Sequence, residues 1–203
     1  MEKPAFTGKE TKKLNEYARE QYEKMNGARF YRNADFIIFL LTYAIIAIAI
    51  RTFLFEPVRV DGESMLPTLQ HGETMFVEKV SYMFGEPERG DIIICFYPGY
   101  RESCVKRVVG LPGETLTILS GKVYIDGQPL DESEYWGDVI LSWDMPFTVE
   151  EGTVFVMGDN RNASKDSRNS SVGCIPYDKI LGKVRAVIWP VAGFRSFGKV
   201  AYS

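Results

Sequence analysis

The stretch Gly62-Glu63-Ser64-Met65-Leu66-Pro67-Thr68-Leu69 marks the point at which the chain changes character. A long apolar run precedes it, and short runs separated by turn residues follow it. Pro67 fixes φ and restricts the residue before it, whereas Gly62 can adopt backbone conformations that residues with a Cβ avoid. We therefore expect Ser64 on a rigid bend, as a candidate nucleophile. An ordinary turn with a capping serine fits the octapeptide equally well.

The segment before this turn has the length of a membrane span. Residues 36–50 carry no charge, and the apolar character continues to Phe55. A helix of about 21 residues from Asp35 is about 31 Å long, enough to cross the hydrocarbon core of a bilayer. A cleaved secretory signal is disfavoured, because the run is too long and no small-residue cleavage site precedes Pro57. We predict a membrane anchor over residues 34–55, with the lipid bilayer as a partner.

The charge distribution indicates an orientation. The formal net charge of −3 gives no reason to expect nucleic acid as a partner. Residues 1–33 carry eight Lys or Arg against five Glu, so the remainder is net negative by six. The side of a membrane span that is richer in Lys and Arg generally stays in the cytoplasm. We therefore predict a single-pass protein of the cell membrane, with a cytoplasmic tail over residues 1–33 and with residues 56–203 outside. Residues 11–26 of the tail predict an amphipathic helix that stops at Gly27.

The part after the anchor has the pattern of β structure. Turn signals such as Pro98-Gly99 and Asp126-Gly127 separate its short runs. Strands are predicted at 58–60, 74–79, 92–97, 104–109, 115–119, 122–125, 153–157 and 182–188. The predicted fold class is mostly β: one antiparallel β domain over residues 56–203, behind one N-terminal transmembrane helix. Residues from about 121 to 150 form a small, strand-poor accessory lobe in this interpretation.

A nucleophilic serine needs a base that takes its proton. His71 is the only histidine, and it lies in a Gln70-His71-Gly72 turn that reads as an exposed loop. The Gly-x-Ser-x-Gly elbow is absent, because Leu66 stands where the second glycine belongs. A Ser-x-x-Lys pattern at residues 196–199 lacks its companion motifs, and we interpret it as chance. These exclusions leave a lysine elsewhere in the chain.

The best candidate for this base is Lys106, within Cys104-Val105-Lys106-Arg107-Val108-Val109. Lysine titrates near 10.4, so it can act near neutrality only if apolar burial destabilises its ammonium. Cys104 and Val108 share its face of the predicted strand. Arg107 also has apolar neighbours, so alternation alone does not choose between the two, but arginine cannot lose its proton. An exposed strand lysine is the alternative reading of Lys106.

A third polar cluster runs from Gly158 to Arg168. It fails as a calcium loop, because Arg161 would occupy a ligand position, and we expect neither a metal nor another cofactor. Asp166 and Arg168 could pair, and Ser164 could orient a neutral lysine.

The three cysteines Cys95, Cys104 and Cys174 are an odd set without CxxC spacing, which gives little support to a metal site. Cys95 and Cys104 lie on two strands of an expected hairpin and could face each other. Whether they pair is open at this point.

Four motifs follow the predicted anchor in order: residues 61–69, 90–94, 106–114 and 158–168. With this order the chain resembles the membrane-anchored type I signal peptidases, the Ser-Lys peptidases of the secretion pathway. The resemblance covers nearly the whole chain. The short segment between Gly113 and Gly158 is similar to the compact Gram-positive members of the family.

The resemblance implies roles for individual residues. Ser64 is then the nucleophile and Lys106 the general base, with Ser164 hydrogen-bonding the lysine and Asp166 and Arg168 holding the Ser164 loop. The backbone N–H of Ser64 would contribute to the oxyanion hole. Some relatives supply the second donor from a serine two residues before the nucleophile. Here Gly62 occupies that position, so the second donor is open.

The resemblance also implies a substrate: exported preproteins, whose signal peptides are cut after small residues of the Ala-x-Ala type through an acyl-enzyme. An extended peptide would pair with strand edges. The matching substrate-binding residues are Val58, Val60, Asp61, Ser103 and Val105. Two alternatives are a self-cleaving Ser-Lys regulator and a catalytically idle anchored binding or assembly protein. The anchor argues against the first, and retention of both Ser64 and Lys106 argues against the second.

Overall fold

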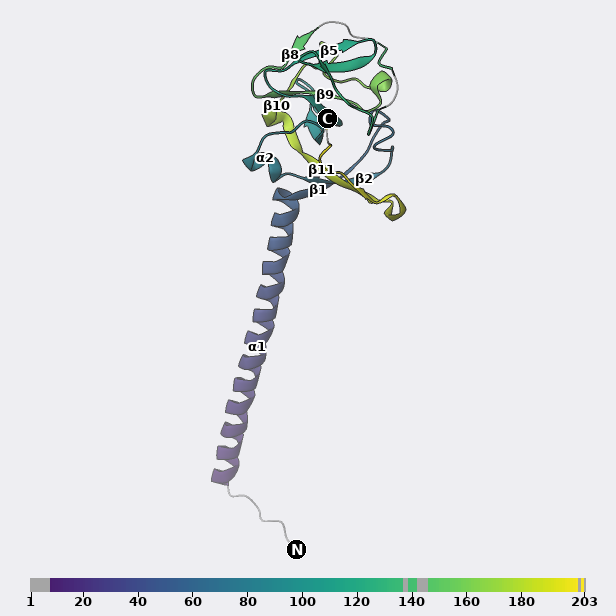
Figure 1. The fold of residues 1–203 in the computed structure, drawn as a ribbon. Helices are drawn as coiled ribbons and strands as arrows, with labels where there is room; N and C mark the ends of the chain where they lie inside the picture. Colours follow the sequence, from purple (N-terminus) through teal and green to yellow (C-terminus); the bar gives the residue numbers. More distant parts are fainter. Residues whose placement is uncertain (1–7, 137–138, 142–145, 201, 203) are drawn as a thin grey trace. The chain divides into compact units, whose positions relative to one another are not determined.

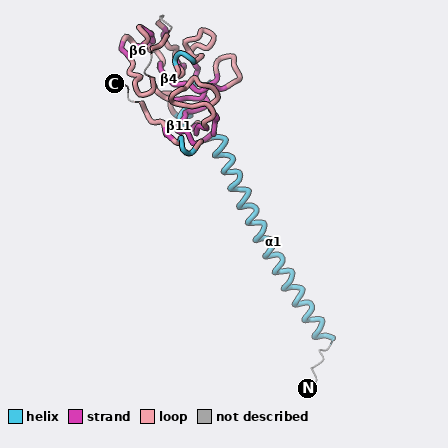
Figure 2. Tube along the Cα trace, turned by 90° about the vertical axis from the view of Figure 1, so that its right-hand side faces the viewer, coloured by secondary structure: helices cyan, strands magenta, loops and turns pink. Residues whose placement is uncertain are grey.

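The structure is a computed structural model that describes residues 8–136, 139–141, 146–200 and 202, with the backbone alone for residues 28–33 and 51–53. The chain divides into two compact units, Met1–Ile50 and Arg51–Ser203. Helix forms the first unit, and strands joined by long loops form the second (Figures 1 and 2). Parts of the predicted tail (1–7) and of the predicted accessory lobe (137–138 and 142–145) lie outside the described residues.

Helix α1, Gly8–Phe53, is continuous for 46 residues. The predicted stop at Gly27 is wrong, because the helix runs through this residue. A glycine inside a helix costs only about 1 kcal/mol relative to alanine. Good helix formers surround it, and ion pairs one turn apart, such as Lys24–Glu20 at 2.8 Å, support the helix. Local helix propensity on both sides therefore outweighs one glycine.

The apolar part of α1 exposes large side chains, among them Phe36, Leu41 and Ile48. Over the residues that the structure describes, no helix combines the length and the hydropathy expected of a membrane span. The anchor at residues 34–55 and the division of the chain into tail, anchor and outer domain stay predictions.

The larger sheet has eight strands, all paired antiparallel. Its order is β1 (Phe55–Arg59), β2 (Thr74–Glu78), β11 (Ile180–Trp189), β3 (Ile92–Phe96), β4 (Ser103–Gly110), β9 (Thr153–Met157) and β10 (Ile175–Pro176), and β12 (Arg195–Ser196) pairs with β11. Strand β1 therefore lies at one edge of the sheet (Figure 1).

A second, four-stranded sheet has the order β7 (Gln128–Pro129), β6 (Lys122–Ile125), β5 (Thr115–Leu119) and β8 (Phe147–Thr148). The accessory lobe predicted at about 121–150 coincides with it in part, because β6, β7 and β8 fall in that range and β5 precedes it. The short helix α2, Ser81–Phe84, and 3-10 turns at Arg161–Ala163, Tyr177–Lys179 and Val191–Gly193 complete the described elements.

The predicted mostly β, antiparallel fold is confirmed, and each of the eight predicted strands is present with shifted ends in several cases. The sequence missed β7, β8, β10 and β12. Each of these has only two residues, too few for an alternating pattern to be recognised.

Strand β9 explains how the two sheets share a core. All five of its residues are buried. Val154 and Val156 pack into a cluster with residues of β3 and β4, whereas Phe155 and Met157 pack with residues of β5 and β6. Because successive side chains of a strand point to opposite faces, both faces of β9 are covered. Its sequence is therefore a continuous apolar run rather than an alternating one.

Two arginine side chains are buried in the domain, and each forms an ion pair with a buried carboxylate. Arg107 donates to both carboxylate oxygens of Asp159 at 2.8 and 2.7 Å, and Arg161 donates to both oxygens of Glu132 at 2.8 and 2.5 Å. The ring of Tyr135 lies 4.0 Å from the guanidinium carbon of Arg107. Desolvated charges of this kind are tolerated only as pairs.

We expect Asp159→Ala to lower the free energy of unfolding by about 3–5 kcal/mol, because it leaves the buried Arg107 charge without a partner. Glu88→Ala is the control, since it breaks an ion pair with Lys199 in which both side chains are at least half exposed. Its cost should not exceed about 1 kcal/mol. Urea denaturation of the two variants and the wild type measures both values. Equal losses would contradict the assignment.

Candidate active site

Ser64 lies on a turn that is fixed from two directions. The side chains of Met65 and Leu69 are buried in the core, and the Leu69 N–H donates to the Met65 carbonyl over 2.9 Å. From the other side, the Asn160 N–H donates to the carbonyl oxygen of Ser64 over 3.0 Å. The turn predicted at this stretch is confirmed. Its backbone is tied both to the core and to the loop that follows β9.

Lys106 of β4 reaches this turn from 42 residues away. Its Nζ donates to Ser64 Oγ over 2.8 Å and to the carbonyl oxygen of Val105 over 2.8 Å. The residue is only 4% exposed. The alternative reading, an exposed strand lysine, is therefore wrong. A hydroxyl and an amine at this distance have the geometry of a nucleophile and its base.

Burial sets the protonation of this lysine. Loss of hydration lowers the pKa of the Lys106 ammonium below its ordinary value, while negative charge at Cys104 and Asp166 acts in the opposite direction. The lowered pKa favours the neutral amine, which is the form that accepts a proton. Arg107, the next residue, is equally buried but is held charged by Asp159. Burial alone therefore does not make a base.

Gly158 and Ser164 pack against the turn that carries Ser64, residues 62–69. A Cβ on Gly158 would lie 2.4 Å from the carbonyl oxygen of Ser64 and 2.3 Å from Ser164 Oγ, so only glycine fits there. The Ser164 hydroxyl oxygen is buried and has no hydrogen-bond partner among the described atoms. The bond from Ser164 to Lys106 that the resemblance implies is not formed in this structure, and the role of Ser164 stays a prediction.

The predicted pairing of Asp166 with Arg168 is confirmed. Arg168 donates to both oxygens of the Asp166 carboxylate at 2.8 Å, and the Gly158 N–H donates to the same carboxylate over 3.0 Å. Arg168 also donates to the carbonyl oxygen of Arg161 over 2.5 Å. This pair therefore fixes the loop that presents Gly158 and Ser164. In the described part of the chain, no three side chains of His, Cys, Asp or Glu are grouped as metal ligands.

Gly62 and His71 interact at the start of the turn. Gly62 has φ of +94°, a conformation that side chains with a Cβ rarely adopt. Its N–H donates to His71 Nδ1 over 3.1 Å, and His71 also lies 3.4 Å from Asp61. The histidine side chain is exposed, as the sequence predicted, and the side chain that hydrogen-bonds to Ser64 Oγ is that of Lys106. His71 supports the turn rather than activating the serine.

A cavity of about 120 Å³ opens beside the Ser64 and Lys106 side chains. The five residues predicted to bind substrate all line it: Val58, Val60, Asp61, Ser103 and Val105. Arg59, Met75, Ile94 and Cys104 complete the lining. The structure therefore brings the predicted substrate-binding residues and the Ser-Lys pair into one place.

Two strand edges border this cavity. Strand β1 is the edge of its sheet and pairs only with β2. Residues 103–106 of β4 pair with β3, whereas the pairing of β4 with β9 begins at Arg107. An extended segment placed here could hydrogen-bond to backbone groups on both sides, which is the geometry of strand addition.

Comparison with known proteins agrees with these observations. The family model for signal peptidase, peptidase S26, matches residues 33–189. This chain belongs to the signal peptidase family. It is 42% identical over 156 residues to signal peptidase I T of Bacillus subtilis (72% of this chain, 80% of that protein). It is 41% identical over 156 residues to signal peptidase I of Leptolyngbya laminosa (72% and 75%), and 40% identical over 176 residues to probable signal peptidase I-1 of Synechocystis (80% and 86%). The family predicted from the four motifs is confirmed.

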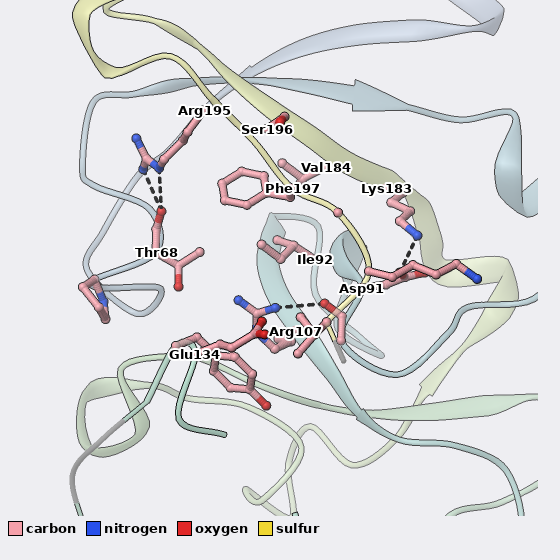
Figure 3. Close-up of a pocket in the computed structure, with 16 residues that line it drawn as sticks. Thr68, Asp91, Ile92, Arg107, Glu134, Lys183, Val184, Arg195, Ser196 and Phe197 are labelled. Carbon is pink, nitrogen blue, oxygen red and sulfur yellow. Dashed lines mark hydrogen bonds and ion pairs between the residues drawn. The ribbon is translucent and has the colours of Figure 1, made fainter. Parts of the chain in front are cut away.

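A second cavity, of about 430 Å³, is lined by Thr68 at the end of the turn that carries Ser64, and by residues of β3, β4, β11 and β12 (Figure 3). Two of its cationic side chains are held by carboxylates, Lys183 by Asp91 and Arg195 by Glu73. Arg195 also donates to the carbonyl oxygen of Thr68 over 2.6 Å, as Figure 3 shows. Through this hydrogen bond, Arg195 holds the end of the turn that carries Ser64 against β12.

Sequence reasoning missed Arg195 and Asn160 as residues that position Ser64. Asn160 lies inside a quoted motif, so its proximity to the turn was a signal that could have been used. Nothing in the sequence near Arg195 points to Thr68, because the contact spans 127 residues. Lys199 of the Ser196–Lys199 pattern is exposed and pairs with Glu88, and the interpretation of this pattern as chance stays a prediction.

Gly158→Ala should destabilise the protein by about 1–3 kcal/mol, because the new methyl group overlaps the rigid Ser64 carbonyl. Gly198→Ala is the matched control, since a Cβ there would have no atom within 4 Å. Thermal unfolding compares the two variants with the wild type. If both lose the same stability, the close packing at Gly158 is not a constraint.

The Lys106 ammonium should titrate below the value of about 10.4 typical of a solvated lysine, because burial disfavours its charge. A pH titration by NMR of protein labelled at the lysine ε-carbons measures this pKa. The resonance of Lys106 is identified by its disappearance in Lys106→Met. A midpoint at or above the solvated value would contradict the electrostatic argument.

Proposed function

We propose that the chain is a membrane-bound serine endopeptidase that removes N-terminal signal peptides from exported preproteins. The observation that carries the proposal is the 2.8 Å hydrogen bond between Lys106 Nζ and Ser64 Oγ at a buried position. Membership of the signal peptidase family supports the same reaction and the same substrate class. Ser64 is the nucleophile and Lys106 the general base in this proposal.

The reaction is an acyl transfer in two steps. Neutral Lys106 takes the hydroxyl proton while Ser64 Oγ bonds to the scissile carbonyl carbon. The lysine then gives this proton to the leaving amine, the C–N bond breaks, and an ester to Ser64 remains. In the second step Lys106 takes a proton from water, whose oxygen attacks the ester, and Ser64 regains its proton as the product acid leaves. The mechanism uses no cofactor.

The supporting residues act on position and charge. The backbone N–H of Ser64 is one donor to the oxyanion. Gly62 offers no hydroxyl as a second donor, so this site relies on one side-chain donor fewer than the relatives that have a serine there. In this proposal Ser164 hydrogen-bonds Lys106 during the reaction, and Asp166 and Arg168 hold the Ser164 loop. The negative charge of Asp166 also limits the fall of the Lys106 pKa.

The cavity size supports cleavage after small residues. Ligand pockets for drug-sized molecules are typically about 300–1,000 Å³, whereas this cavity measures about 120 Å³. A cavity of this size favours a short side chain such as that of alanine. The peptide backbone would lie between the β1 edge and residues 103–106, with alternate side chains directed toward Val58, Val60, Asp61, Ser103 and Val105.

Membrane attachment belongs to the same proposal. The support comes from the charge-free run of residues 36–50 and from the apolar side chains that α1 exposes along it. The positive excess in residues 1–33 supports a cytoplasmic N-terminus, with the catalytic domain outside.

A preprotein cleavage assay tests the proposal. Ser64→Ala, Lys106→Met and Lys106→Arg should each lower kcat/KM by about 10⁴-fold or more while the unfolding temperature stays near that of the wild type. Lys106→Arg fails because a guanidinium cannot shed its charge. Mass spectrometry of the products locates the cut after a small residue.

Lys199→Met is the control for this assay, since it makes the same change at an exposed lysine and should cleave as the wild type does. Full activity of Lys106→Met would refute the Ser-Lys pair. If the preprotein stays intact while the chain cuts itself, the protein is a self-cleaving regulator.

A further inference from the structure

Two thiols lie opposite each other beside the small cavity. Cys95 of β3 and Cys104 of β4 are directly opposed in the antiparallel ladder, with their Sγ atoms 3.6 Å apart. Both are free thiols in this structure, as is Cys174. Opposed residues in such a ladder have Cα atoms about 4.5–5.5 Å apart, inside the range of about 4.4–6.8 Å that a disulfide needs. A bond therefore requires only a small movement of the two sulfur atoms.

The two thiols have unequal surroundings. Cys104 is half-buried and lines the cavity together with Ser64 and Lys106, whereas Cys95 is fully buried behind it. The hydrogen bond with Cys95 lowers the pKa of the Cys104 thiol to about 7 despite burial. The same hydrogen bond and burial raise the pKa of Cys95. Cys104 is thus the accessible nucleophile, and Cys95 is placed to react after it.

We propose that Cys104 and Cys95 form an oxidisable dithiol, in which Cys104 reacts with small disulfides that enter the cavity and Cys95 clears the resulting adduct. The co-reactant is a low-molecular-weight disulfide, RSSR. This modification site is separate from the Ser-Lys chemistry, although it shares the cavity wall.

The chemistry takes two exchange steps. The Cys104 thiolate attacks one sulfur of RSSR, the R–S–S–R bond breaks, and one RS⁻ leaves and takes a proton. Cys95 then loses its proton and attacks Cys104 Sγ, which expels the second RS⁻. The net result is one protein disulfide and two RSH, so two electrons pass from the protein thiols to RSSR. A reducing thiol reverses both steps.

The arrangement has a consequence for the cavity. Cys104 borders a space of about 120 Å³ that Ser64 and Lys106 also border, so an adduct held on it would compete with a peptide for that space. When Cys95 displaces the adduct from Cys104, the cavity is free again, because the new disulfide lies between β3 and β4. Under the proposed function, the dithiol keeps the enzyme active after exposure to disulfides.

Mass spectrometry of the full chain tests the chemistry independently of activity. The probe is bis(2-hydroxyethyl) disulfide at neutral pH. The wild type should form a disulfide that joins the peptides of Cys95 and Cys104 and should retain no adduct. Cys95→Ser should trap one mercaptoethanol on Cys104, about ten-fold faster than on Cys174, the internal reference whose pKa burial raises. Cys104→Ser should form neither product at this pair.

Three results would overturn the proposal: a lasting adduct on Cys104 of the wild type, modification of Cys174 before Cys104, or an unmodified Cys104 in Cys95→Ser. Mapping of the wild type alone is decisive if a variant does not fold.

Preprotein cleavage is the second readout, and it rests on the proposed function. The probe should abolish cleavage by Cys95→Ser, with recovery in dithiothreitol, and should spare the wild type. A wild type that never cleaves would refute the proposed function while the mass result still decides the thiol chemistry.

Discussion

The hydrogen bond between Lys106 Nζ and Ser64 Oγ depends on three segments that are distant in sequence. Strand β4 carries the lysine, the turn after β1 carries the serine, and the loop after β9 holds the Ser64 carbonyl through Asn160. The bond also requires that the amine be desolvated, so the same packing that brings the segments together lowers the pKa of the lysine. Geometry and protonation at this site therefore have one physical origin.

Two neighbouring cationic residues of β4, Lys106 and Arg107, are equally buried but differ in their partners. Lys106 and Arg107 are buried to the same extent on opposite faces of the strand. Arg107 receives a complete carboxylate partner in Asp159, and it remains charged. Lys106 receives a hydroxyl and a carbonyl oxygen instead, groups that do not neutralise an ammonium. Burial is common to Lys106 and Arg107, so the difference in how firmly each keeps its charge follows from the partners of each side chain.

Local patterns in the sequence predicted the strands, the turn at Ser64 and the pairing of Asp166 with Arg168, because each depends on residues close together in the chain. The motifs also predicted the family, and they contain Ser64 and Lys106, the two side chains that the structure brings within 2.8 Å of each other. Alternation failed to choose between Lys106 and Arg107, because core clusters cover both faces of β4. The contact of Arg195 with Thr68 and the unpaired state of Ser164 were beyond prediction, since they arise from tertiary packing between loops. Gly27 was misread as a helix end because its neighbours outweigh a single unfavourable residue.

The burial of both faces of β9 has a consequence for the motions of the site. An amide in this strand becomes accessible to solvent deuterium only when both sheets separate, so its hydrogen exchange should proceed by global unfolding rather than by local fluctuation. Gly158 and Asn160 follow directly from this strand, and they support the Ser64 carbonyl and the Ser164 loop. The turn that carries Ser64 is therefore tied to a strand that is buried on both faces, and we expect its geometry to be among the last features lost when the domain unfolds.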